Sequence, residues 1–183
     1  MVKAYSVVIP VFNGEATIVE AIASVTAQTI PPQQVIVVDD GSTDNTLAIV
    51  SALAGPIKIV QQSNQGPGAA TSVGFSLCDT ELVATLDADD IWLPKKISKQ
   101  LTAMNCQPDL AAVFCRLANF YADPNTADFA GARGGWSRST MLIKRNVIAD
   151  IGPIIDPPGR AGEMVDWFAR GLELGHLMHV MDE

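Results

Sequence analysis

The sequence predicts an α/β fold in which a mostly parallel central sheet is flanked by helices. Over residues 5–104, short apolar runs alternate with stretches of helical periodicity. This alternation is typical of βαβ units, whose strands lie parallel and whose helices cover the sheet. Two of the apolar runs end in clustered carboxylates. Because ligands of open α/β sheets bind beyond the carboxyl ends of the strands, these acids also predict where the functional site lies.

Four apolar runs are the predicted strands of the first half of the chain. They cover residues 5–10, 35–38, 57–60 and 82–86. The second run has no alternation of polar and apolar residues, which predicts a strand that is buried on both faces. We therefore expect these runs to form the centre of the sheet.

The stretches between these runs are predicted helices. They cover about 15–28, 43–53, 66–77 and 94–104. Asn13 is the predicted cap of the first helix, and either Ser42 or Thr43 begins the second. The predicted buried face of the first helix consists of Ile18, Ala21, Ile22 and Val25.

The second half of the chain is less regular. We expect strands at 110–114 and 140–143 and helices at 145–151 and 163–174. Residues 121–135 are rich in Asp, Gly, Ala and Asn, which predicts a mobile loop, and residues 156–159 predict a turn. Since no linker divides the chain, we expect a single domain over residues 1–183.

Composition excludes several classes of protein. The chain has 183 residues, of which 48% are hydrophobic, and this suits one domain with a sizeable core. A net charge of −8 argues against nucleic acid as a partner. No apolar run approaches the roughly 20 residues of a membrane span, and no signal peptide is visible. The three cysteines lack metal-site spacing, so we expect reduced thiols in a cytoplasmic protein.

Three carboxylates follow the fourth predicted strand, at Asp87, Asp89 and Asp90. Carboxylates this close repel one another and raise each other's proton affinity. A divalent cation such as Mg²⁺ or Mn²⁺ relieves the repulsion and prefers oxygen ligands. The alternative is that the acids only cap the next helix, although capping needs one acid rather than three.

Two further segments accompany these acids. Asp39 and Asp40 end the strand at 35–38, and we expect them to face the cleft while Ser42 caps the next helix. Ordinary turn acids are the alternative. Residues 64–70 bring small side chains to a helix start, where backbone amides can face a phosphate. This segment lacks the lysine of a P-loop, so a plain turn is an equal alternative.

Together these motifs resemble the family 2 glycosyltransferases, which have the GT-A fold. The resemblance rests on SVVIPVFNG at 6–14, VDDGSTD at 38–44, NQGPGAA at 64–70 and LDADDIW at 86–92. It implies inverting transfer from a nucleotide-sugar, expected to be a UDP-sugar, with a divalent metal, Mn²⁺ or Mg²⁺. It also divides the single GT-A domain into a nucleotide-sugar-binding half, 1–104, and an acceptor-side half, 105–183. Family members commonly have further residues after this helix, so we expect either a second half that is shortened at its C-terminus or a minimal catalytic domain.

The resemblance also assigns residues to the site. The expected nucleotide-sugar-binding residues are Pro10, Val11, Glu15, Asp39, Gly68, Asp87 and Ala88. In the family, the acid matching Asp39 contacts the base, and the acid matching Asp87 lies near the ribose and phosphates. Asp89 matches the metal-binding acid of the D-x-D motif. The metal would neutralise the departing diphosphate.

One departure from the family pattern concerns positive charge. The family often continues the Ala-Ala of the third segment with Arg-Asn, whereas Thr71 and Ser72 follow here. A cation is therefore missing from this position. We expect the metal and two phosphates to neutralise the acids with no basic residue nearby.

A second departure concerns the catalytic base. The family usually places it in a Glu-Asp pair that opens a late helix, and here Met164 follows Glu163. Glu163 and Asp166 are the remaining carboxylates that could deprotonate an acceptor. Asp166 is favoured because Trp167, next to it, should hold this turn against the core.

Other functions remain open at this point. The Met164 departure also suits a nucleotide-sugar-binding protein that has lost its base. A phosphohydrolase is a further alternative, because Asp87-Ala88-Asp89 after an apolar strand is similar to an aspartyl-phosphate motif. The expected acceptor is a carbohydrate or a lipid-linked acceptor of unknown identity. A homodimer and a peripheral association with the membrane are both compatible with the sequence, and polysaccharide biosynthesis is the typical setting of the family.

Overall fold

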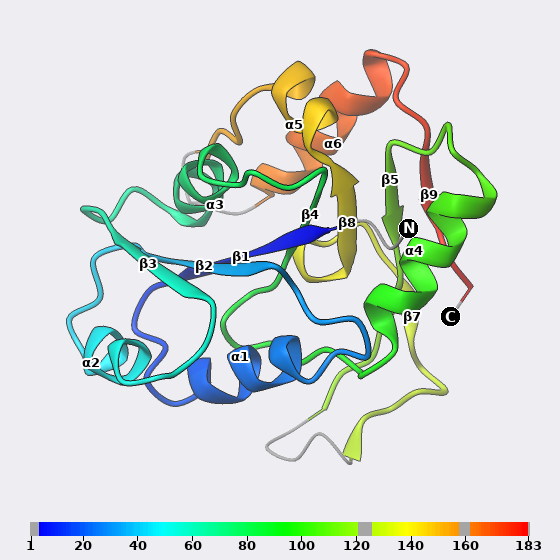
Figure 1. Cartoon of the computed structure of the whole chain (residues 1–183). Coiled ribbons are helices and arrows are strands. Elements are labelled where there is room, and N and C mark those ends of the chain that lie inside the picture. The colour runs from blue at the N-terminus through cyan, green and yellow to red at the C-terminus, as the bar shows by residue number, and fades with distance from the viewer. Residues whose placement is uncertain (1–3, 121–125, 158–161, 183) are drawn as a thin grey trace.

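The computed structural model describes residues 4–120, 126–157 and 162–182. Within these residues the strands form two sheets. The strands of the large sheet are β1 (Tyr5–Val11), β2 (Gln34–Asp39), β3 (Ile57–Gln61), β4 (Leu82–Thr85), β5 (Ala112–Phe114), β8 (Met141–Lys144) and β9 (Met178–Val180). A small second sheet pairs β6 (Arg116–Leu117) with β7 (Arg133–Gly134). The order of the large sheet is β3-β2-β1-β4-β8-β5-β9, so it spans both halves of the chain (Figure 1).

Strand direction in the large sheet decides where the site forms. The pairs β1–β2, β1–β4, β2–β3 and β5–β9 are parallel, which confirms the expected mostly parallel sheet. The exception is β8, which lies antiparallel to both β4 and β5. Because β8 runs against β4, the residues just before β8 lie beside the carboxyl end of β4. Strand direction has no signature in an apolar run, so the sequence did not predict this juxtaposition.

Helices cover both faces of the sheet, as Figure 1 shows. They are α1 (Ile18–Thr26), α2 (Thr46–Ser51), α3 (Pro67–Ser76), α4 (Lys96–Cys106), α5 (Arg145–Ile151) and α6 (Glu163–Glu173). Alternate residues of β1 enter two cores. Val7 and Ile9 pack with α1, α2 and α4, whereas Val8 packs with α3, α5 and α6. The predicted buried face of α1 is confirmed.

Both predicted helix caps are wrong. Asn13 precedes α1 by several residues and has a φ of 53°, and its side-chain oxygen accepts a hydrogen bond from the Thr43 amide at 2.8 Å. Ser42 accepts a hydrogen bond from the Asn13 amide at 2.9 Å instead of capping α2. The two loops that follow β1 and β2 lie side by side and are joined by these hydrogen bonds, and Asp44 accepts a hydrogen bond from the Thr46 amide at the start of α2, at 3.0 Å.

Two predicted segments fall partly outside the described residues. These are the loop at 121–135, of which 121–125 are outside, and the turn at 156–159, of which 158 and 159 are outside. Within the loop, Arg133 and Gly134 form β7. Among the helices of the described chain, none has the length and apolar character needed to cross a membrane.

Candidate active site

A cavity of about 440 Å³ lies beyond the carboxyl ends of β1 and β4. The expected donor-site residues that line it are Pro10, Val11, Asp87, Ala88 and Asp89. Asp40 also lines it, although the family resemblance did not place it among the donor-binding residues. Glu15 in the loop after β1, Asp39 at the end of β2 and Gly68 in the first turn of α3 do not line the cavity. The two acidic strand ends and the β1 end are therefore brought together as the strand order predicts.

The acids that follow β2 are engaged with their own loops. Asp39 is buried, and its carboxylate accepts a hydrogen bond from the Ser42 amide at 3.1 Å. Asp40 is also buried and accepts hydrogen bonds from the Gln62 side chain and from the amides of Gln65 and Gly66, at 2.7 to 2.8 Å. The expectation that both side chains are free to face the cleft is wrong for Asp39, which does not line the cavity, whereas Asp40 lines it with a carboxylate that is already hydrogen-bonded to loop amides. Asp40 thereby fixes the segment that enters α3.

Glu15 also stabilises a loop. Its carboxylate accepts hydrogen bonds from the backbone and side-chain nitrogens of Asn45, at 3.0 and 2.9 Å. In return, the Glu15 amide donates to Asp44 at 3.1 Å. Glu15 thus ties the segment after β1 to the start of α2 at the rim of the cavity.

A carboxylate from outside α3 accepts hydrogen bonds from the first turn of this helix, and the sequence did not predict the contact. Asp156 accepts hydrogen bonds from the amides of Gly68 and Ala69, at 2.9 and 2.7 Å. A Cβ atom on Gly68 would lie 2.8 Å from the Asp156 carboxylate and 2.7 Å from the side chain of Ile154. The amides that could face a phosphate therefore hold a protein carboxylate here, which explains why this position is glycine.

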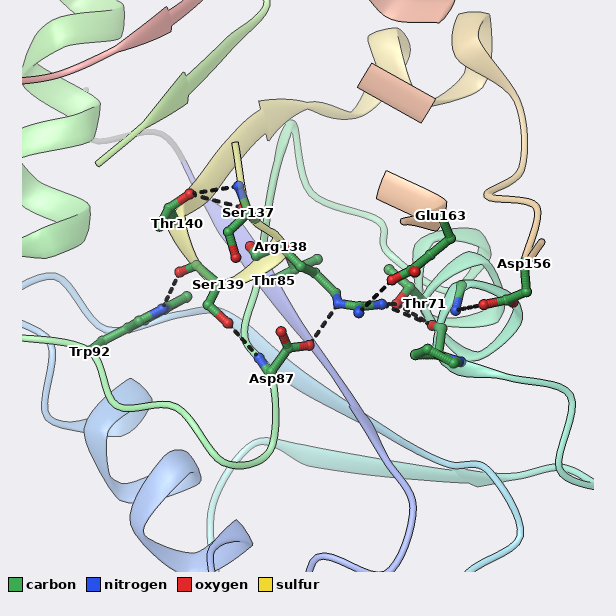
Figure 2. Close-up of polar contacts among 12 residues, drawn as sticks. Thr71, Thr85, Asp87, Trp92, Ser137, Arg138, Ser139, Thr140, Asp156 and Glu163 are labelled. Atoms are coloured by element: carbon green, nitrogen blue, oxygen red, sulfur yellow. Dashed lines mark hydrogen bonds and ion pairs between the residues drawn. The ribbon is translucent and has the colours of Figure 1, made fainter. Parts of the chain in front are cut away.

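Arg138 is the central cation of the site (Figure 2). Its side chain is 9% exposed, and its Nε lies 2.7 Å from the Asp87 carboxylate. One terminal nitrogen donates to Glu163 at 2.9 Å. The other donates to the Pro67 carbonyl and to the Thr71 hydroxyl, at 3.1 and 3.0 Å. The expectation that no basic residue lies near these acids is wrong, since Arg138 comes from the segment before β8 and contacts Thr71, where the family pattern often has Arg.

The segment around Arg138 is fixed to β4 and its following loop. The Thr85 hydroxyl donates to the Arg138 carbonyl at 2.6 Å, and the Trp92 indole donates to the Ser139 carbonyl at 2.8 Å. The Ser139 hydroxyl accepts a hydrogen bond from the Asp87 amide at 2.9 Å. These contacts follow from the antiparallel placement of β8 and hold Asp87 from both its backbone and its side chain.

Burial and Arg138 shift the pKa of Asp87 in opposite directions. Burial raises the pKa of Asp87 because it disfavours the charged form, and the Arg138 guanidinium opposes this effect. Burial likewise raises the pKa of Asp90. Asp89 lies between them and is exposed at the cavity, so it is the acid most accessible to a ligand.

The two candidate bases on α6 lie in different surroundings. Glu163 is buried and belongs to the Arg138 cluster. Asp166 is exposed and pairs at 3.0 Å with Arg170, whose guanidinium also donates to the carbonyls of Ile151 and Pro153. Met164 points into the apolar core. The i and i+3 spacing of the two acids therefore does not place both of them in the site.

A divalent cation fits this arrangement only if the protein and the donor both coordinate it. Within the described ranges, no group of three or more His, Cys, Asp or Glu residues could hold a metal ion. Magnesium-type sites commonly use one or two carboxylates together with substrate phosphates. Exposed Asp89 beside the cavity meets that requirement, while Asp87 is already paired with Arg138.

Comparison with known proteins identifies the class that this fold and site define. The sequence pattern of glycosyl transferase family 2 matches residues 6–163, so the chain belongs to that family. It is 36% identical over 133 residues to an uncharacterized glycosyltransferase of Nostoc sp., covering 70% of this chain and 41% of that protein. It is 28% identical over 196 residues to the succinoglycan biosynthesis protein ExoU of Rhizobium meliloti, covering 92% of this chain and 57% of that protein. The chain thus spans about half the length of these relatives or less.

Solved structures share the fold. Staphylococcus aureus TarS, residues 1–349 in complex with UDP, superposes with a TM-score of 0.77 at 23% identity. A mannosyltransferase of Pyrobaculum calidifontis in complex with GDP-Man and Mn²⁺ gives a TM-score of 0.77 at 20% identity. Each comparison covers 98% of this chain, but 58% and 55% of the other chain. Together with the sheet order, they establish the GT-A fold.

Proposed function

We propose that this protein transfers a sugar from a nucleoside-diphosphate sugar, expected to be a UDP-sugar, to an acceptor hydroxyl with inversion. The observation that carries the proposal is the convergence of the β1 and β4 ends on one cavity that contains Asp87 and Asp89. Membership in the family supports sugar transfer. Bound UDP and GDP-Man in proteins of the same fold support the class of donor.

In this proposal, the residues of the β1 end border the nucleotide and the acids after β4 lie at its phosphates. Pro10 and Val11 provide the wall, and Asp87 is oriented by Arg138 and Ser139. Asp89 would hold Mn²⁺ or Mg²⁺ jointly with the donor. When bound, such an ion stabilises negative charge on the departing diphosphate.

The transfer exchanges two bonds at the anomeric carbon of the sugar. The acceptor oxygen forms a bond to the anomeric carbon while the bond between that carbon and the diphosphate oxygen breaks. The nucleoside diphosphate leaves with the electron pair of the broken bond. The acceptor hydroxyl loses its proton to a carboxylate. We propose Glu163 and Asp166 as the two carboxylates of α6 to be tested for this role. Glu163 lies in the same cluster as Asp87, whereas Asp166 must leave Arg170 to reach a substrate.

A second function is favoured by the state of α6. Met164 is buried in the core, and both neighbouring acids are engaged in ion pairs. A protein that binds a nucleotide-sugar without transferring the sugar would have these features. The phosphohydrolase alternative receives no such support, because Asp87 is held by Arg138 and family membership indicates sugar transfer.

The donor proposal is tested by calorimetry with UDP. We expect binding in Mn²⁺, little binding in chelator, and more than ten-fold weaker binding by Asp89→Ala, or over about 1.4 kcal/mol. Asp109→Ala is the matched control, because Asp109 is an exposed acid outside the cavity. Equal UDP affinity with and without Mn²⁺ would contradict the metal proposal.

The transfer proposal is tested by single-turnover assays on Glu163→Gln and Asp166→Asn. Loss of transfer with unchanged UDP affinity in one variant identifies the base. Loss of both transfer and UDP affinity in Glu163→Gln assigns Glu163 a structural role instead. UDP binding by the unmodified protein without transfer to any acceptor tested supports the binding-only function.

The wider setting remains part of this proposal. We propose a single domain over residues 1–183 with a donor half and an acceptor-side half, acting in the cytoplasm or at the membrane periphery. Carbohydrate assembly such as polysaccharide biosynthesis is supported by the similarity to a succinoglycan biosynthesis protein. A homodimer is tested by light scattering.

A further inference from the structure

A second and larger cavity lies next to the donor cavity. Its volume is about 850 Å³, within the range of small-molecule sites. Its walls come from the loop after β4, the start of α4, the segment from Cys115 to Phe120, and residues near Phe129 and Met181. Asp89 lines both cavities, so they adjoin at the acid proposed to hold the metal. A molecule in the second cavity would therefore reach the donor at this point.

The lining of the second cavity is rich in apolar side chains that face water. Leu93, Leu117 and Phe129 are 60%, 39% and 56% exposed. Trp92 and Met181 add buried apolar surface to the same cavity. Exposed apolar groups that gather around a concave surface mark binding sites, because covering them with an apolar ligand is favourable by about 25 cal/mol per Å². This cavity therefore suits a ligand with an apolar body.

The same cavity collects positive charge in an acidic protein. Lys95, Lys96 and Lys99 of the α4 start and Arg116 of β6 all line it, although the chain carries a net charge of −8. The acids that line it are Asp89, Asp90 and Asp182. Lys95 is the N-cap of α4, and Lys96 and Lys99 lie in its first turn, which gives one wall of the cavity a local positive charge. That wall would attract an anionic group on the ligand.

Lys96 is the buried member of this group. Its ammonium donates a hydrogen bond to Gln100 at 2.9 Å and lies 4.0 Å above the Trp92 ring. Burial lowers its pKa to about 8. Within the described residues, this ammonium contacts Gln100, the Met141 carbonyl and the Trp92 ring and no carboxylate, so an anion in the cavity would stabilise its charged form.

We infer that the second cavity binds the acceptor, and that the acceptor is an amphipathic lipid phosphate: an apolar chain attached to a phosphate group. This inference rests on the proposed sugar transfer and names the substrate class of the acceptor side. The chain lies against Leu93, Leu117 and Phe129, and the phosphate lies toward the lysines of α4. The phosphate also carries a polar head group, and a hydroxyl of that head group receives the sugar near Asp89, where the two cavities adjoin.

Calorimetry with soluble alkyl phosphates, below their critical micelle concentrations, tests the inference on the full chain. Decyl phosphate is expected to bind at least ten-fold more tightly than butyl phosphate, and at least ten-fold more tightly than decanol or decyl maltoside. The first comparison tests the apolar wall, and the second tests the cationic wall. Equal affinity for decyl phosphate and the neutral decyl compounds, or no binding of decyl phosphate, would overturn the inference.

Matched variants locate the binding. Leu93→Ser is compared with Leu174→Ser, since Leu174 is 57% exposed but lies outside the cavity. The pair Lys95→Ala and Lys99→Ala is compared with Lys58→Ala on β3. Cavity variants should weaken decyl phosphate binding at least five-fold with an unchanged denaturation midpoint, and control variants should not. Equal effects of the cavity and control variants would overturn the assignment.

The same samples separate this inference from the proposed donor function. UDP is titrated in Mn²⁺ with and without saturating decyl phosphate. UDP binding without decyl phosphate binding contradicts the acceptor inference alone. Decyl phosphate binding without UDP binding contradicts the proposed sugar transfer, and with it the acceptor role of the cavity. Binding of both, with decyl phosphate unable to displace UDP, supports two adjoining sites.

Discussion

Replacing Arg138 should be among the most damaging single changes in the site. Its guanidinium contacts Asp87, Glu163 and Thr71, so Arg138→Met leaves two carboxylates without their cation. Removing one partner of a buried ion pair costs about 3–5 kcal/mol because an uncompensated charge remains. The Asp87 side chain keeps 32% exposure, so water compensates part of the loss. We therefore expect the lower end, about 3 kcal/mol of the free energy of unfolding.

The assay is urea unfolding followed by tryptophan fluorescence, with thermal unfolding as a second measurement. For a domain of this size, the expected loss corresponds to a fall in Tm of roughly 6–12 °C. Lys58→Ala serves as a control for loss of a cation, because Lys58 is exposed on β3. A midpoint for Arg138→Met within about 0.5 kcal/mol of the unmodified protein would refute the argument that Arg138 compensates buried charge.

A double variant isolates the charge effect from lost packing. Adding Glu163→Gln to Arg138→Met removes one of the two uncompensated carboxylates, so the double variant should be more stable than the sum of the single effects predicts. The destabilisation of Arg138→Met should also shrink at low pH, because the pKa of Asp87 is raised by burial and this carboxyl is neutral there. Additive effects that do not depend on pH would show that packing alone accounts for the loss.

The sign of the pH dependence in the unmodified protein follows from Asp87. The pKa of this carboxyl in the folded state is raised by burial above its ordinary value of about 4. The folded state therefore holds more protons than the unfolded state between the ordinary and the raised value. The stability contributed by this group is present below that window and is lost as pH rises through it. Asp87→Asn should remove this component of the pH profile, measured by urea unfolding at several acidic pH values.

Three more predictions use stability as the readout. Gly68→Ala should lower the free energy of unfolding by about 1–3 kcal/mol, since overpacking against Asp156 and Ile154 outweighs the gain of about 1 kcal/mol in helix propensity. Ser76→Ala in the last turn of α3 is the control. An unchanged free energy of unfolding in Gly68→Ala would contradict the close approach. Asp156→Ala should cost about 1–3 kcal/mol because two amides of α3 lose their acceptor, and unchanged thermal stability would show that these hydrogen bonds are dispensable. Burial lowers the Lys96 pKa to about 8, so the free energy of unfolding of the unmodified protein minus that of Lys96→Met should rise with pH from about 8 to 10.4. The difference cancels the opposite contributions of Cys78 and Tyr5, whose pKa values burial raises, and a constant difference would contradict the buried ammonium.

Much of the fold followed from local patterns. Continuous apolar runs predicted β1 to β4, and the buried face of α1 followed from residues spaced by three and four. The acids at 87, 89 and 90 were identified because carboxylates directly after an apolar strand are uncommon without a ligand or a partner. These features depend only on residues that are close in the sequence, so each could be predicted from a single segment of the chain.

The partner of those acids could not be found in this way. Arg138 lies about fifty residues further along the chain, and its segment reads as an ordinary polar stretch. Only the antiparallel direction of β8 brings it beside β4. The same holds for Asp156, which reads as a turn residue and reaches the first turn of α3 across the fold. Long-range pairs of charges have no local signature, because their energy arises only after the strands are ordered.

The fold class, the acidic strand ends and the family could all be predicted from local sequence patterns. The tertiary structure decided which carboxylates remain available. Asp39 and Asp40 accept hydrogen bonds from loop amides, Glu163 pairs with Arg138, and Asp89 stays exposed at the cavity. The physical reason is that a buried carboxylate must find donors or a cation wherever the fold supplies them, and that supply is set by packing between elements far apart in the chain.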